Sequence, residues 1–173
     1  MKQTVILTAI LAALTQYASA DEIKDSNPVE GEGVLAPKIE SRINEKFSPV
    51  EGDRFIVSLS RMNWFAALVF CTEQNAKPLS LEFGKDDIIK KQFIEFIKLY
   101  HLQSRSYWLN GNRLEDDVTF RWGLGGMPLS HTDWDKNQPD NAGGTQRCMR
   151  LFETMMWDDD DCFVINYAAC QKY

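Results

Sequence analysis

The stretch that decides the fold runs from residue 137 to residue 162 and reads NQPDNAGGTQRCMRLFETMMWDDDDC. It contains two oxygen-rich groups, one around Gln138 and Asp140 and the other the consecutive aspartates at 158–161. Adjacent carboxylates repel one another, and such a run alone is typical of a solvated surface turn. Cys148 and Cys162 flank it, however, and a disulfide between them would hold the run in place.

Calcium is the cation that these groups favour, because it takes roughly six to eight oxygen ligands from carboxylates, amides and main-chain carbonyls. Two amides and three carboxylates are on offer: Gln138, Gln146, Asp140, Asp158 and Asp159. The three carboxylates supply enough negative charge to hold a divalent ion while part of its shell stays open for a further ligand. We therefore expect one Ca2+ site, with these five residues as its metal ligands.

The start of the chain indicates a secreted, extracellular protein. Lys2, an apolar run at 5–14 and Ala18-Ser19-Ala20 together have the form of a signal peptide, residues 1–20, cleaved after Ala20. Outside the cell an even set of four cysteines favours two disulfides, with three pairings open, over a zinc site, since no C-x-x-C pair is present. No stretch reaches the roughly 18 to 20 apolar residues of a transmembrane helix.

Length and charge narrow the classes of function. The chain has 173 residues, 44% of them hydrophobic, which suits a single folded domain. Its net charge is −6 at pH 7 and becomes more negative once Lys2 is removed. Because nucleic acids and anionic membranes attract basic surfaces, neither is expected as a partner.

The first half of the chain predicts a leader, a strand and two helices. Residues 21–46 are polar, contain prolines and glycines, and predict a flexible N-terminal leader. Alternating apolar residues at 54–60 predict a strand, and Asn63 is a good N-cap for a helix that ends before Pro78. Apolar residues at helical spacing over 89–100 predict a second helix, with Lys90 and Lys91 facing water.

Beyond residue 102 the helical period disappears. Short strands are expected at 107–109, 119–122, 148–152 and 163–172, which makes the fold class α+β. The connection at 123–144 is long for a compact domain, and long connections tend to carry function or to be disordered.

A series of motifs resembles a known family. In chain order they are Asn63-Trp64-Phe65-Ala66-Ala67 with Cys71, Tyr107-Trp108-Leu109, Phe120-Arg121-Trp122, Asp133-Trp134, Gln138-Pro139-Asp140, Cys148, Trp157-Asp158-Asp159, Cys162 and Cys170. On these residues the segment 47–173 resembles a C-type lectin-like carbohydrate-recognition domain of the short, four-cysteine form.

The resemblance implies a fold of two helices packed on small antiparallel sheets, with a long calcium- and sugar-binding loop. It implies the disulfides Cys71–Cys170 and Cys148–Cys162 and a cis peptide bond before Pro139. It further implies that calcium binds two vicinal hydroxyls of a sugar, with the Gln-Pro-Asp order typical of galactose-type members. The sugar-binding residues that it implies are Gln138, Asp140, Gln146 and Asp158.

The chain also departs from the family pattern. Gln146 stands where the family has glutamate and Asp158 where it has asparagine, so the ligand charge is unchanged. Arg113 and Arg147 occupy acidic positions of a second calcium site found in some members, which argues against that site. No aromatic residue follows the tripeptide to stack on a sugar, and Trp157 is expected to pack beneath the site.

Three classes of function follow. The first is a secreted calcium-dependent lectin that binds galactose-type glycans, with oligomers or clustered ligands supplying avidity. The second is a calcium-independent protein-interaction module on the same fold, which would follow if Gln146 disrupts the calcium site. The third, an enzyme such as a glycosidase, is disfavoured because carboxylates that hold calcium are poor proton donors, and no catalytic residue is assigned.

Overall fold

The computed structural model describes residues 48–173, so the expected signal peptide and leader, residues 1–46, lie outside the described residues. The described part has two α-helices, α3 (Trp64–Glu73) and α4 (Ile88–Leu99). It has eight strands: β1 (Val50–Glu51), β2 (Phe55–Met62), β3 (Ala76–Pro78), β4 (Tyr107–Asn112), β5 (Arg121–Trp122), β6 (Gln146–Leu151), β7 (Trp157–Asp161) and β8 (Asn166–Lys172). The α+β class is confirmed.

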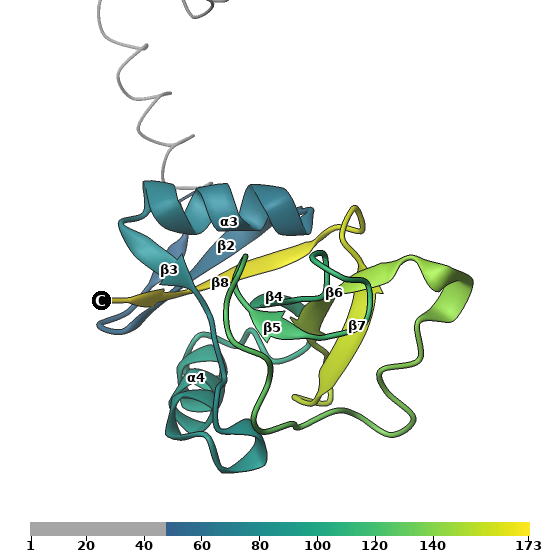
Figure 1. Cartoon of the computed structure of the whole chain (residues 1–173). Helices are drawn as coiled ribbons and strands as arrows, with labels where there is room; N and C mark the ends of the chain where they lie inside the picture. Colours follow the sequence, from purple (N-terminus) through teal and green to yellow (C-terminus); the bar gives the residue numbers. More distant parts are fainter. Residues whose placement is uncertain (1–47) are drawn as a thin grey trace, which may run out of the picture. The chain divides into compact units, whose positions relative to one another are not determined.

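The strands form one mixed sheet rather than small antiparallel sheets. Their order is β1-β2-β8-β4-β6-β7, with β3 also pairing with β8 and β5 with β4. All pairs are antiparallel except β4 with β8, where Tyr107 lies opposite Tyr167. The parallel pair arises because the last strand returns to the middle of the sheet and lies between β2 and β4, as Figure 1 shows.

Helix α3 begins where the sequence predicts. The Asn63 side chain accepts a hydrogen bond from the Ala66 N–H at 2.9 Å, which satisfies one of the free amides of the first turn. The helix packs on β8 and is joined to it by the disulfide Cys71–Cys170. The second disulfide, Cys148–Cys162, joins β6 to the residue that directly follows β7. Both pairings are those that the family resemblance implies.

Helix α4 confirms the second predicted helix, but one residue predicted to face water is buried. Phe93 and Ile97 are buried as expected. Lys90, expected to face water, is only 8% exposed, and its ammonium forms an ion pair with Asp133. The hydrophobic period could not show this, because the partner carboxylate lies on the distant long connection. This ion pair joins α4 to the middle of the long connection.

The aspartate run is a strand and not a solvated turn. Residues 158–161 belong to β7, which pairs with β6 along its whole length. Asp158, Asp159 and Asp160 are 7%, 0% and 7% exposed. The expectation of mutual repulsion was incomplete because it left out cations from neighbouring strands, which are described below.

The main core lies between the sheet and α4. Phe93 and Tyr107 meet edge to face with ring centroids 5.2 Å apart. Glycine at residue 111 leaves room for the buried side chain of Met149, since a Cβ there would lie 2.1 Å from Sδ of Met149. Neither helix of the described residues is long and apolar enough to cross a membrane.

Phe93→Ala should lower the free energy of unfolding by about 3 to 5 kcal/mol, because it removes a fully buried ring and leaves a cavity. Phe83→Ala is the matched control, since Phe83 is 61% exposed and should cost about 0.5 kcal/mol. Urea denaturation followed by circular dichroism measures both. Equal losses for the two variants would contradict the assignment of the core.

Candidate functional site

The long connection forms a loop, residues 137–146, that packs against β7. The Gln138–Pro139 peptide bond is cis, as the resemblance implies. Asn141 adopts a left-handed backbone conformation with φ of 48°, which asparagine tolerates better than most residues. This reversal turns the amide groups of residues 140–142 toward the candidate ligands.

Four of the five predicted ligands meet at these amides. The Asp140 N–H donates to Gln138 Oε1 at 2.9 Å and to Asp159 Oδ1 at 3.0 Å. The Ala142 N–H donates to Asp140 Oδ1 at 3.0 Å and to Gln146 Oε1 at 2.7 Å. Residues separated by up to 21 positions in the chain, Gln138 and Asp159, are therefore brought to one short backbone segment.

Asp159 is the fixed point of this group. It is fully buried, and its second carboxylate oxygen accepts the Asn141 N–H at 3.1 Å. The same oxygen lies 3.2 Å from Nη2 of Arg113. Burial raises the pKa of Asp159, and the two backbone amides and the guanidinium oppose that rise.

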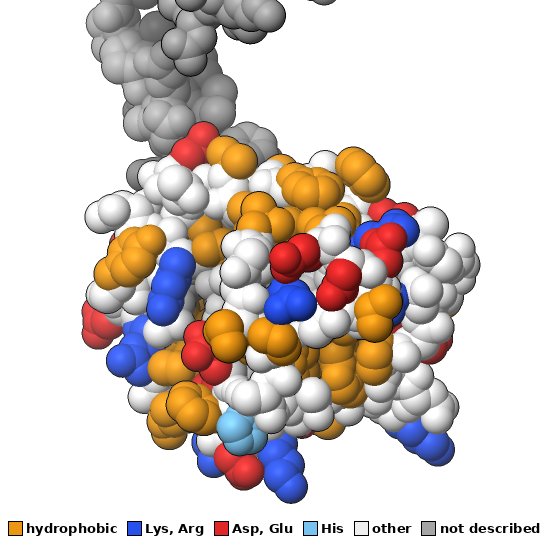
Figure 2. All heavy atoms as spheres, in the orientation of Figure 1, with side chains coloured by type: hydrophobic (Ala, Val, Ile, Leu, Met, Phe, Trp, Pro, Cys, Tyr) orange, Lys and Arg blue, Asp and Glu red, His pale blue; other side chains and the backbone are white. Residues whose placement is uncertain are grey.

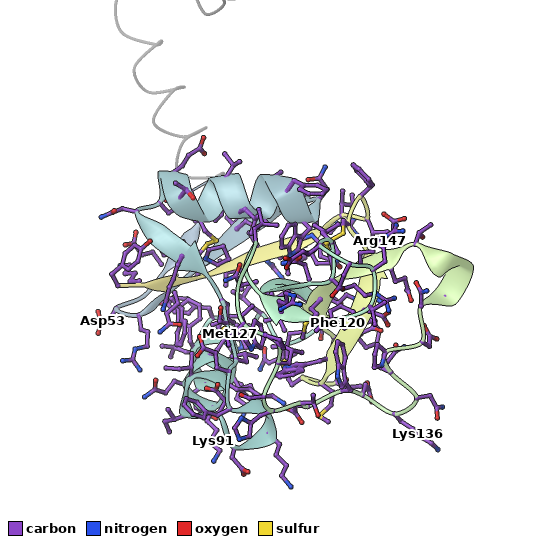
Figure 3. The ribbon with its side chains drawn as sticks, in the orientation of Figure 1. Asp53, Lys91, Phe120, Met127, Lys136 and Arg147 are labelled. Atoms are coloured by element: carbon purple, nitrogen blue, oxygen red, sulfur yellow. A yellow bond between two sulfur atoms is a disulfide. The ribbon has the colours of Figure 1, made fainter. Side chains whose placement is uncertain are left out.

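Arg113 joins three segments. Besides Asp159 on β7, its Nε and Nη2 donate to the Gln146 carbonyl oxygen on β6 at 3.0 and 2.6 Å. Its guanidinium also lies over the ring of Phe120, 4.9 Å from the centroid, at the interior position that Figure 3 labels. A planar guanidinium suits this role because it can donate to two acceptors while stacking on an aromatic face.

Asp158, the fifth predicted ligand, does not join the other four. It lies opposite Arg150 in the β6–β7 pairing, and Nη2 of Arg150 is 2.6 Å from Asp158 Oδ2. Nη1 of the same arginine is 2.5 Å from Asp160 Oδ2. Burial raises the pKa of Asp158, against the hydrogen bond from Arg150. One arginine therefore offsets two carboxylates on this side of β7.

Arg147, which occupies an expected acidic position of a second calcium site, has its own carboxylate partner. It forms a two-point ion pair with Asp117, and that hydrogen bond lowers the pKa of Asp117. Figure 2 shows acidic and basic side chains lying next to one another on this face, including the region of Arg147 labelled in Figure 3. The carboxylates here are matched by arginines of the same chain.

Three tryptophans pack against one another in the interior next to β7. Trp157 is fully buried and meets Trp122 and Trp134 edge to face, at centroid distances of 5.4 and 5.7 Å. The backbone N–H of Trp157 donates to the Asp133 carbonyl oxygen, and the backbone carbonyl oxygen of Trp157 accepts the Asp135 N–H. Trp157 is thus packed in the interior directly before the aspartates of β7, as expected, and these bonds also anchor the middle of the long connection.

The oxygen atoms of the candidate ligands are of the kinds that calcium binds, but their arrangement fits a calcium site only in part. Gln138, Asp140, Gln146 and Asp159 offer the amide and carboxylate oxygens that calcium prefers. Within residues 48–173, however, no three acidic, histidine or cysteine side chains form a group that could hold a metal. Calcium could be bound by these four residues with main-chain oxygens and water, and the guanidinium beside Asp159 would weaken it.

Sequence reasoning missed the roles of Arg113 and Arg150. For Arg150 a signal was present, because Asp158 and Asp160 alternate like residues on one face of a strand, and one arginine on a neighbouring strand can reach both. For Arg113 no local signal exists, since it lies 46 residues before Asp159.

Known proteins share this fold. The family description "Lectin C-type domain" matches residues 60–172. Hepatic lectin of Gallus gallus is 24% identical over 123 residues, which cover 70% of this chain but 56% of that protein. C-type lectin 37Db of Drosophila melanogaster is 24% identical over 135 residues, 78% of this chain and 82% of the relative. The carbohydrate-recognition domain of mouse scavenger receptor C-type lectin has a TM-score of 0.57 and 24% identity, covering 72% of this chain and 92% of that one.

Arg113→Gln should lower the free energy of unfolding by about 3 kcal/mol, because it leaves the buried carboxylate of Asp159 without its guanidinium. Arg147→Gln is the matched control. Its pair with Asp117 is exposed to water, so its loss should be clearly smaller. Urea denaturation at constant salt measures both, and an equal cost for the two variants would contradict the central role given to Arg113.

Proposed function

The chain belongs to the family of C-type lectin domains, and from this membership we propose that it binds carbohydrate with loop 137–146 and strand β7. The gathering of Gln138, Asp140, Gln146 and Asp159 at one backbone segment is the observation that supports the proposal. The family and its fold serve carbohydrate binding and not catalysis.

Hydroxyl recognition is the chemistry that these residues suit. A sugar hydroxyl both donates and accepts hydrogen bonds, so it needs an acceptor such as a carboxylate and a donor such as an amide. The Asp140 carboxylate supplies an acceptor, and the side-chain amides of Gln138 and Gln146 each supply both an acceptor and a donor. A calcium ion held by this set together with Asp159 would supply a positive centre for two vicinal hydroxyls. Asp158 is the further proposed ligand, and it would have to leave Arg150 to reach the ion.

The proposed sugar is of the galactose type. The order of amide and carboxylate across Pro139 decides where donors and acceptors stand, and therefore which diol geometry is matched. Gln138 first and Asp140 second is the order that the family associates with galactose. The proposed sugar-binding residues are Gln138, Asp140, Gln146 and Asp158.

Secretion and clustering complete this proposal. The signal-peptide pattern at residues 1–20 and the two disulfides suit an extracellular protein. One site of this kind binds a monosaccharide weakly, so useful avidity would come from oligomers or from clustered glycans.

A calcium-independent interaction module is the alternative, and one observation favours it. Arg113 and Arg150 already offset the buried carboxylates of β7, so the loop is held without a divalent ion. The family also includes calcium-independent members.

Calcium should bind with a stoichiometry of one and a dissociation constant of roughly 0.1 to 1 mM. Saturating calcium should raise the melting temperature by roughly 5 °C, because the ion binds only the folded chain. Asp140→Asn should abolish the shift, whereas Asp161→Asn, which changes the same residue type outside the proposed ligand set, should retain it. A titration without heat or melting shift would favour the calcium-independent alternative.

Galactose should displace the wild-type protein from a mixed-glycan resin at lower concentration than mannose. The double variant Gln138→Glu with Asp140→Asn keeps the charge and reverses the order of amide and carboxylate, so it should prefer mannose. Competition elution in calcium, repeated in chelator, measures both preferences. Better displacement of the wild-type protein by mannose would refute the galactose assignment, and no retention at all despite calcium binding would support the interaction module.

A further inference from the structure

A second polar pocket lies outside the loop site. It has a volume of about 200 Å³ and is formed by the end of β2, the segment before β4, the β6–β7 turn and the start of β8. Its polar lining is Arg61, Ser104, Arg105, Ser106, Glu153 and Asn166. Pockets for whole drug-sized ligands run from about 300 to 1,000 Å³, so this one suits a single chemical group.

The two arginines of this pocket lack the carboxylate partner that most arginines in the described part of the chain have. Among these residues Arg54 also has no carboxylate partner, but it donates to Gln92 instead. Four arginines elsewhere each form an ion pair with a carboxylate: Arg113, Arg121, Arg147 and Arg150. Within residues 48–173, Arg61 and Arg105 form no such pair, yet both line the same pocket. In a chain of net charge −6, two guanidiniums without carboxylate partners in one pocket indicate an anion as the ligand.

Arg105 is held in place and is incompletely bonded. Its guanidinium lies over the ring of Tyr167, 4.4 Å from the centroid, which fixes its plane. Its Nη1 is buried and has no hydrogen-bond acceptor among residues 48–173. A buried charged donor without an acceptor is costly, and an anionic oxygen in the pocket would remove that cost.

The remaining lining supplies further donors. The hydroxyl groups of Ser104 and Ser106 can each donate to an oxyanion. The amide of Asn166 lies between the pocket and Asp160, whose carboxylate is offset by Arg150, so this nearby negative charge is already balanced. Glu153 is the one carboxylate of the lining, and it is exposed. The lining therefore carries a net positive charge.

We propose that this pocket binds an oxyanion of the sulfate or phosphate type, with Arg61 and Arg105 as the charged donors. Such a group is carried by sulfated sugars and also occurs as the free inorganic ion. Guanidinium groups bind both well, because their N–H groups match two oxygens of the anion at once. The pocket shares no lining residue with loop 137–146 or with the proposed calcium ligands.

The test titrates the full folded chain with inorganic sulfate at constant ionic strength, followed by amide chemical shifts. Arg61→Gln and Arg105→Gln should each weaken sulfate binding by roughly tenfold or more, since each removes a charge-assisted hydrogen bond. Arg54→Gln is the matched control, because Arg54 bonds to Gln92 outside the pocket. Glu153→Gln should strengthen binding by removing the carboxylate of the lining.

The outcomes separate the pocket from general salt effects. Unchanged affinity in Arg61→Gln, or an equal loss in Arg54→Gln, overturns the proposal; Arg61 is exposed, so misfolding of its variant does not confuse the result. Asp140→Asn and chelator should leave sulfate affinity unchanged, which keeps this test separate from that of the sugar site. A sulfated monosaccharide that binds more tightly than both sulfate and its unsulfated parent identifies a glycan as the source, and equal affinity for sulfate and the sulfated sugar identifies the free ion.

Discussion

The ion pair between Arg113 and Asp159 is the interaction on which the position of loop 137–146 depends. Asp159 is fully buried, and both of its oxygens hold backbone amides of the loop. A buried carboxylate would tend to lose its charge without a cation nearby, and a neutral acid accepts those hydrogen bonds less well. Arg113 opposes the rise that burial causes in the pKa of Asp159, and it also holds the strand that ends the loop, through the Gln146 carbonyl oxygen.

Local signals in the sequence predicted much of the fold. The Asn63 cap, the period of α4 and the cysteine-bearing motifs placed both helices and, through the family resemblance, both disulfides. Four of the five proposed ligands lie together in the fold, and their role as ligands stays a prediction. The predictions that were wrong concern residues whose partners are distant in the chain. Lys90 is buried because it pairs with Asp133. The aspartates of β7 can lie in a buried strand because Arg113 and Arg150 offset their charges. Periodicity describes one segment at a time and contains no information about such partners.

The two proposed binding regions share one line of polar contacts. Asn166 lines the oxyanion pocket and donates to Asp160, which Arg150 joins to Asp158 on β7. Each region includes strand residues, Asp159 of β7 in the first and Asn166 of β8 in the second, and the sheet and the Cys148–Cys162 disulfide hold these strands in place. A rigid base of this kind favours binding, because less conformational entropy is lost when a ligand is held.

The fork of Arg150 between Asp158 and Asp160 makes the three residues depend on one another for charge balance. Without the arginine, two buried aspartates would leave uncompensated charge in the sheet, and without the aspartates the arginine would be a partly buried cation without a carboxylate partner. Once all three are present, single replacements are costly, and this corner of the fold can change only by coordinated substitution.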